Sequence, residues 1–201
     1  MADVITDIYR TLADPAQSLY KDKGSKFIGF AFPVDTEEEI KQILGQLRKE
    51  YFDARHYCYA YILDPAGTSY RANDDGEPNH SAGDPILGQI RAAGLSHILV
   101  VVIRYFGGIK LGVSGLIQAY KTAAAEAIAQ AIIIEKVETT TLQVNFNYEY
   151  MNAVMGLVKE YKLEIKEQDF NLSCQLKIAV RKSLLPIITD KLCSIGIIEI
   201  T

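Results

Sequence analysis

The sequence has few cysteines, no long hydrophobic run and one long stretch without acidic residues. The three cysteines, Cys58, Cys174 and Cys193, are an odd number without CxxC spacing, which disfavours a disulfide framework or a structural zinc site. No segment reaches the roughly 18 uncharged apolar residues that a membrane span requires. The N-terminus, MADVITDIYR, carries acids where a secretory signal has its apolar core. We therefore expect a reduced, cytoplasmic protein with no membrane contact.

Composition indicates a folded protein. Of the 201 residues, 49% are hydrophobic and 23% are charged, which is ordinary for globular domains and excludes disorder over most of the chain. The net charge of −4 disfavours indiscriminate coating of nucleic acid. From Pro85 to Ala125, however, the cations Arg91, Arg104, Lys110 and Lys121 occur without a single acid. They could form a local basic face on an acidic body, or they could lie on unrelated surfaces.

Residues 1–135 are predicted to form one domain of mixed helices and strands. Strands are expected at 26–34, 56–63, 68–72 and 96–105, the last being an unbroken apolar run typical of a central strand. Thr36 and Glu39 have the spacing of a capping box at the start of an amphipathic helix. Asp84-Pro85 has the pattern of an N-cap followed by proline at the first helical position, so a second helix should begin there and end before Gly94. A third helix should span 114–131.

Residues 136–201 are predicted to form a second domain, since the pattern changes after Glu135. Strands are expected at 139–147, 163–170, 172–180 and 195–200. One helix around 151–158 and another capped by Ser183 should separate them. This βαββαβ order is the ferredoxin-like pattern. Both domains therefore belong to the α+β class.

The segment from Arg104 to Gly115 has the composition of an anion site. A buried strand enters a glycine-rich turn that feeds a helix, so backbone N–H groups, the helix dipole and cations could meet a phosphate. The spacing matches neither a P-loop nor a GxGxxG motif. Alternatively, the glycines serve tight packing and Arg104 forms a local ion pair. The candidate binding residues are Arg104, Tyr105, Gly107, Gly108, Lys110, Gly112, Ser114 and Lys121. Of the two aromatic residues after Arg104, Tyr105 and Phe106, at most one should point outward to stack on a base.

The acidic segment Asp74-Asp75-Gly76-Glu77-Pro78 is a second candidate site. With His56, the carboxylates of Asp74, Asp75 and Glu77 could form an acid–base cleft or hold Mg²⁺. The same residues are also typical of a solvated turn, in which glycine supplies a positive φ. No acyl-transfer signature is present. We assign no catalytic residue, no metal ligand and no cofactor from the sequence.

Five motifs in order resemble the Impact/YigZ family over roughly residues 20–130. They are Lys23-Gly24-Ser25-Lys26-Phe27, Ala54-Arg55-His56, Asp74 to Pro78, Ala82-Gly83-x-Pro85-Ile86-Leu87, and Arg104-Tyr105-Phe106-Gly107-Gly108-Ile109-Lys110-Leu111-Gly112. The resemblance implies a first domain with the α/β sandwich of the second domain of ribosomal protein S5. It also implies that the tail is the ferredoxin-like domain of bacterial two-domain members, which is similar to a module of the ribosomal translocase.

The resemblance also implies a link to translation. Eukaryotic relatives restrain the kinase pathway that phosphorylates an initiation factor, by competing for the kinase's activator. This chain begins almost directly with the Impact-like domain, so we do not expect that partner to carry over. Asn79-His80-Ser81 departs from the smaller residues of many members, which weakens a role for that loop's backbone. We expect a regulatory protein that binds RNA or the ribosome. It could also bind a protein partner in translation control. The alternatives are a small-molecule hydrolase or transferase, and an interaction module without catalysis.

Overall fold

The computed structural model describes residues 7–171, 173–195 and 199–200, and they divide into two compact units. The larger unit is Tyr9–Lys136. The smaller unit contains the described residues before Tyr9 and those from Val137 onward. The buried hydrophobic residues of the larger unit form two clusters, and those of the smaller unit form one.

The larger unit is built on a five-stranded antiparallel sheet in the order β2-β3-β6-β4-β5. The strands are β2 (Ala16–Asp22), β3 (Ser25–Pro33), β4 (His56–Ile62), β5 (Tyr70–Asn73) and β6 (Ile98–Tyr105). Strand β6 occupies the centre, as its unbroken apolar run predicts, and its residues from Ile98 to Arg104 are all buried. The sequence did not predict β2, because Ala16–Asp22 carries little apolar character.

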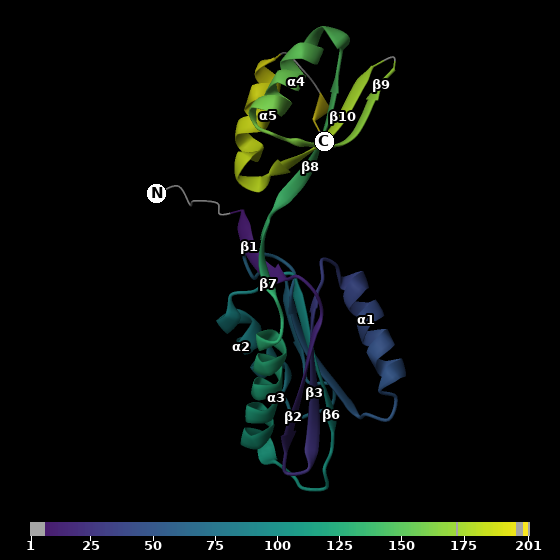
Figure 1. Ribbon diagram of the computed structural model, residues 1–201, viewed down its shortest axis with the longest axis vertical. Coiled ribbons are helices and arrows are strands. Elements are labelled where there is room, and N and C mark those ends of the chain that lie inside the picture. Colours follow the sequence, from purple (N-terminus) through teal and green to yellow (C-terminus); the bar gives the residue numbers. More distant parts are fainter. Residues whose placement is uncertain (1–6, 172, 196–198, 201) are drawn as a thin grey trace. The chain divides into compact units, whose positions relative to one another are not determined.

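Helices cover both faces of this sheet (Figure 1). The helices are α1 (Glu37–Glu50), α2 (Gly83–Ala93) and α3 (Gly112–Ala129). Because side chains alternate along a strand, Val100 and Val102 of β6 join the core under α2 and α3. Val101 and Ile103 join the core under α1.

The helix ends of the larger unit test local predictions. The Thr36–Glu39 capping box is present at the start of α1, and Gly94 adopts a left-handed conformation after α2, so both predictions are confirmed. The predicted cap at Asp84 is wrong. Helix α2 starts at Gly83 instead, because the distant Asp74 carboxylate accepts hydrogen bonds from the N–H groups of Ala82 and Gly83. Helix α3 begins at Gly112, two residues before the predicted start.

The smaller unit contains a four-stranded sheet in the order β11-β8-β10-β9, with every adjacent pair antiparallel. Its strands are β8 (Thr139–Phe146), β9 (Glu164–Phe170), β10 (Cys174–Arg181) and β11 (Glu199–Ile200). Helix α4 (Met151–Glu160) follows the 3₁₀ turn η1 (Tyr148–Tyr150), and α5 (Leu185–Ser194) follows η2 (Lys182–Leu184). Val154 of α4 and Ile188 of α5 are buried in one core with Leu176 of β10.

Two predictions in the smaller unit are wrong. Ser183 does not cap a helix: it lies in η2, and its hydroxyl and N–H group donate to the carboxylate of Asp7, which leaves Pro186 in the first turn of α5. The predicted strand 195–200 starts too early, because Ile195 is the C-cap of α5, whereas Glu199–Ile200 form β11. Leu172 and residues 196–198 lie outside the described residues.

A separate two-stranded sheet pairs β1 (Ile8–Leu12) with β7 (Ile133–Val137). The sequence predicted neither strand, since their pairing depends on segments more than a hundred residues apart. None of the described helices has the length and apolar character of a bilayer span.

Candidate functional site

The glycine-rich turn between β6 and α3 packs against the turn between β2 and β3. A Cβ atom on Gly107 would lie 1.9 Å from the carbonyl carbon of Gly24, so only glycine permits this approach. The Gly107 N–H group also donates to the Ser25 hydroxyl at 3.2 Å. Gly108 and Gly112 have φ angles of 88° and 74°, the left-handed region that favours glycine. The glycines therefore set the shape of the turn, and the predicted packing role applies to Gly107.

The turn exposes both apolar and basic side chains. Phe106, Ile109 and Val113 are each more than half exposed, and Lys110 is exposed beside them. Along α3, Ile117 and Lys121 follow Val113 at intervals of four residues, which places them on the same side of the helix. The Gly24–Gly107 contact brings Lys23 to this end of the unit. We call the set Lys23, Phe106, Ile109, Lys110, Val113, Ile117 and Lys121 the glycine-turn face.

The N-terminus of α3 adds partial positive charge to this face. The N-cap residue Leu111 provides no side-chain cap, and the first turn of the helix contains no acid. Ser114, in that first turn, is exposed. Uncapped N–H groups at a helix start carry the positive end of the helix dipole and accommodate anions. The arrangement is therefore able to meet a phosphate.

Tyr105 does not join the glycine-turn face, contrary to its assignment from the sequence. Its side chain is half-buried on the α1 side of the sheet, and its hydroxyl donates to the Asp53 carboxylate at 2.7 Å. This hydrogen bond, with partial burial, raises the pKa of Tyr105 to about 12. Phe106 is the exposed member of the aromatic pair. This agrees with the prediction from strand alternation that at most one of the two points outward.

Arg104 is a buried structural residue, which corrects its assignment as a surface cation. Only 8% of its side chain is exposed, and its Nη1 atom donates to Glu77 Oε1 at 2.6 Å. The Tyr120 hydroxyl donates to the same oxygen at 2.8 Å. The guanidinium carbon lies 5.5 Å from the ring centre of Phe27 and 5.6 Å from that of Phe106. The local ion pair that the sequence left as an alternative is therefore present.

Tyr120 is a member of this buried cluster that sequence reasoning missed. Burial raises the pKa of its hydroxyl, and the neighbouring Cys58 and Glu77 raise it further. Its ring packs edge-on against Phe27, with centroids 5.2 Å apart. The only available signal was a tyrosine within an alanine-rich helix, which does not identify a partner.

Asp74 holds the start of α2. Its carboxylate accepts hydrogen bonds from the N–H groups of His80 at 2.9 Å, Ala82 at 2.9 Å and Gly83 at 2.8 Å. Burial opposes ionisation of Asp74, but these backbone donors outweigh burial and hold its pKa below the usual value. The carboxylate therefore acts as a remote helix cap.

Asp75 and His56 tie the acidic loop to the sheet. Asp75 accepts from the Tyr57 N–H group and from the Arg48 guanidinium, each at 2.7 Å. His56 Nδ1 lies 3.0 Å from the backbone carbonyl oxygen of Asp75, not from a carboxylate. Asp75 and Gly76 have positive φ angles of 41° and 85°, so the segment is a turn in which an aspartate and a glycine adopt the left-handed region that both tolerate.

The acidic loop therefore has the contacts of a structural element. Asp74, Asp75 and Glu77 each face a different protein donor. Within the described ranges, no three His, Cys, Asp or Glu side chains gather as metal ligands would. Cys58 is fully buried, its thiol donates to the Asp74 carbonyl at 3.0 Å, and burial raises its pKa. The residues of the acid–base cleft that the sequence suggested do lie close together. Their three carboxylates, however, already bind protein donors.

Comparisons with known proteins agree with the motif resemblance. Residues 23–128 match the Impact N-terminal domain. A Thermus thermophilus protein named IMPACT family member in pol 5'region is 39% identical over 71% of this chain and 76% of its own length. The Escherichia coli IMPACT family member YigZ is 31% identical over 84% of this chain and 83% of its own length. A crystal structure described as a hypothetical protein superposes with a TM-score of 0.74 and 27% identity, covering 98% of this chain and 97% of that one.

Proposed function

The chain belongs to the Impact/YigZ family, and on that premise we propose that it is a translation-linked regulatory protein that binds RNA or the ribosome through the glycine-turn face. The observation that carries the proposal is the uncapped start of α3 beside exposed Lys110, in a stretch without acids. The proposal places the protein in the cytoplasm, where its target is found. A protein partner in translation control is compatible with the same face.

Each part of the glycine-turn face has a role in this proposal. The N–H groups of the first turn of α3 meet a phosphate, and Lys110 contributes the formal charge next to them. Lys121 and Lys23 extend the positive potential along the face. Phe106, 56% exposed, supplies a ring on which an unpaired base stacks. The buried Arg104 guanidinium packs against the Phe106 ring and supports it without contacting the ligand.

We also infer the two fold types that the resemblance implies. The larger unit, with helices on both faces of a β2-β3-β6-β4-β5 sheet, is proposed to share the fold of the second domain of ribosomal protein S5. The smaller unit is proposed to be ferredoxin-like. Its support is the βαββαβ chain order together with the strand order β11-β8-β10-β9.

Ribosome co-sedimentation over a potassium chloride series tests the proposal. The logarithm of the binding constant falls linearly with the logarithm of the salt concentration. Removing one cation that contacts a phosphate should make this slope less steep by roughly 0.7–0.9. We expect this decrease for Lys110→Ala and for Lys121→Ala. Lys159→Ala, which removes an exposed cation from α4 in the smaller unit, should leave the slope unchanged. Melting temperatures equal to the parent's establish that each variant is folded.

An unchanged affinity and slope in both folded variants would refute phosphate contact at this face. Retention that is insensitive to salt but lost in Ile109→Ser would instead favour the interaction module without catalysis. That second candidate has its own support, because Ile109, Val113 and Ile117 expose more apolar surface than phosphate binding requires. The hydrolase or transferase alternative has less support, since Asp74 and Glu77 are occupied by protein donors.

A further inference from the structure

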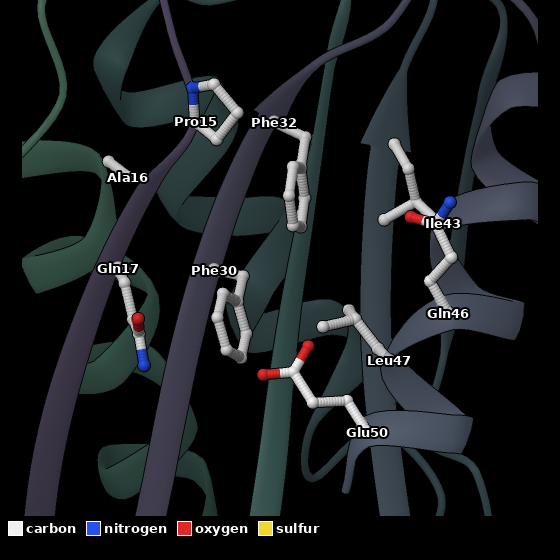
Figure 2. Close-up of a pocket in the computed structure, with 9 residues that line it drawn as sticks. All are labelled: Pro15, Ala16, Gln17, Phe30, Phe32, Ile43, Gln46, Leu47 and Glu50. Atoms are coloured by element: carbon white, nitrogen blue, oxygen red, sulfur yellow. The ribbon is translucent and has the colours of Figure 1, made fainter.

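A cleft of about 300 Å³ lies in the larger unit between strands β2 and β3 and helix α1 (Figure 2). This volume is at the lower end of the range for ligand sites, which are mostly apolar with a few polar groups that set orientation. The residues that line it are Pro15, Ala16, Gln17, Phe30, Phe32, Ile43, Gln46, Leu47 and Glu50. None of them belongs to the glycine-turn face.

The floor of the cleft is a pair of aromatic rings. Phe30 and Phe32 stack along β3 with centroids 6.0 Å apart and planes 14° apart. In Figure 2 they stand opposite Ile43 and Leu47 of α1. Phe30 is buried, whereas Phe32 and Ile43 are only half-buried. The apolar walls are therefore partly open to solvent.

The apolar surface continues out of the cleft along the sheet. Ile28, two residues before Phe30, lies on the same face of β3. Leu19 of β2 pairs with Ile28 in the register and is 55% exposed. From Ile28 to Phe32 the strip is about 13 Å long, at the rise of a β-strand. Its length suits an extended chain of about four residues rather than a single compact group.

The cleft has an acidic polar side. Glu50 is the charged member of the lining set, and Gln17 and Gln46 are the amides. Figure 2 shows the Glu50 carboxylate within the cleft, next to Phe30. Burial raises the pKa of Tyr51, and the nearby Glu50 raises it further. A carboxylate within an apolar cleft is complementary to an organic cation that also carries apolar groups, through ion pairing.

We propose that this cleft and strip dock an extended segment of a partner polypeptide that combines large apolar side chains with a lysine or arginine. One apolar side chain fills the space between Phe32 and Ile43. The basic side chain pairs with Glu50, and a second apolar side chain covers Leu19 and Ile28. The site lies on the α1 face of the sheet, so it is independent of the proposed function at the glycine turn.

Protein NMR with a matched peptide series tests the proposal on the full chain. The probes are the acetylated and amidated peptide Phe-Gly-Lys-Gly-Leu, whose three anchoring side chains lie on one side of an extended chain, and its versions with glutamine or glutamate in place of lysine. We expect amide shifts concentrated on β2, β3 and α1, with affinity in the order lysine, glutamine, glutamate. An ion pair at a partly exposed site should make the lysine peptide bind about two- to fivefold more tightly than the glutamine peptide.

Variants identify the groups responsible. Glu50→Gln should abolish the preference for the lysine peptide, while Glu38→Gln, which removes the same charge from an exposed position on α1, should keep it. Gln17→Lys places a competing cation at the cleft and should lower the affinity of the lysine peptide at least twofold. Gln42→Lys, exposed on α1 outside the lining set, should leave that affinity unchanged.

Four outcomes would overturn the proposal. They are no saturable shift at millimolar peptide, shifts centred outside the cleft and strip, an equal affinity for the three peptides, and a lysine preference that survives Glu50→Gln. Two further results would assign the site to another occupant. The first is 3-phenylpropylamine binding as tightly as the lysine peptide, which identifies a small-amine site. The second is dimerisation that Phe32→Ser abolishes and the peptide does not compete with, which identifies a second copy.

Discussion

Replacing Arg104 with methionine should destabilise the larger unit by about 3–5 kcal/mol, the usual effect of removing one partner from a buried ion pair. The Glu77 carboxylate would remain in the core, with its side chain 4% exposed and, among the described residues, only the Tyr120 hydroxyl as a partner. Tyr120→Phe removes one hydrogen bond to the charged group and should cost about 1.5–3 kcal/mol. The double variant Arg104→Met/Glu77→Leu leaves no buried charge. We expect its loss to be smaller than that of Arg104→Met alone.

Urea unfolding of the four proteins, followed by circular dichroism, measures these differences. A constant slope of free energy against urea indicates that the unfolding transition exposes the same surface in each variant. Ribosome co-sedimentation of the double variant then separates structure from contact. If Arg104 acts only by supporting Phe106 and the turn, the folded double variant should retain most of the parent's affinity. Arg104→Met costing less than about 1 kcal/mol while abolishing ribosome binding would refute the reasoning, because the guanidinium would then have to face the ligand.

Three further predictions concern Gly107, Asp74 and the independence of the larger unit. Gly107→Ala should destabilise the larger unit by about 3 kcal/mol, because the added Cβ atom meets the Gly24 backbone. The control is Gly67→Ala, which has a φ of 70° and open space around it and should cost about 1 kcal/mol. Thermal melts compare the two variants. Asp74→Asn should lower the free energy of unfolding by about 1–3 kcal/mol at pH 7. This difference in stability from the parent should shrink below about pH 4, because a carboxylate with a lowered pKa contributes stability that is lost as it protonates. A pH-independent difference would contradict the capping role. A fragment of residues 9–136 should give dispersed amide resonances, and a collapsed spectrum would show that it needs the rest of the chain.

The sequence by itself determined the features that depend on neighbouring residues. The Thr36–Glu39 capping box, the left-handed Gly94 and the central position of β6 are all present. Each depends on contacts within one turn, or on the period with which apolar residues repeat, and both can be read along the chain. The family motifs could also be recognised from the sequence, because each is a contiguous string of residues.

Only the tertiary structure decided which charges are free. Arg104 and Lys110 are equivalent cations in the sequence, yet β6 carries Arg104 into the core beside Glu77, and the turn leaves Lys110 exposed. Asp74 caps a helix that starts nine residues later, and Gly107 requires glycine because Gly24, more than eighty residues away, lies against it. The cleft beside α1 exists only because β2, a strand with little apolar character, pairs with β3. These features depend on which strands become neighbours, and strand pairing arises from packing of the whole sheet rather than from local pattern.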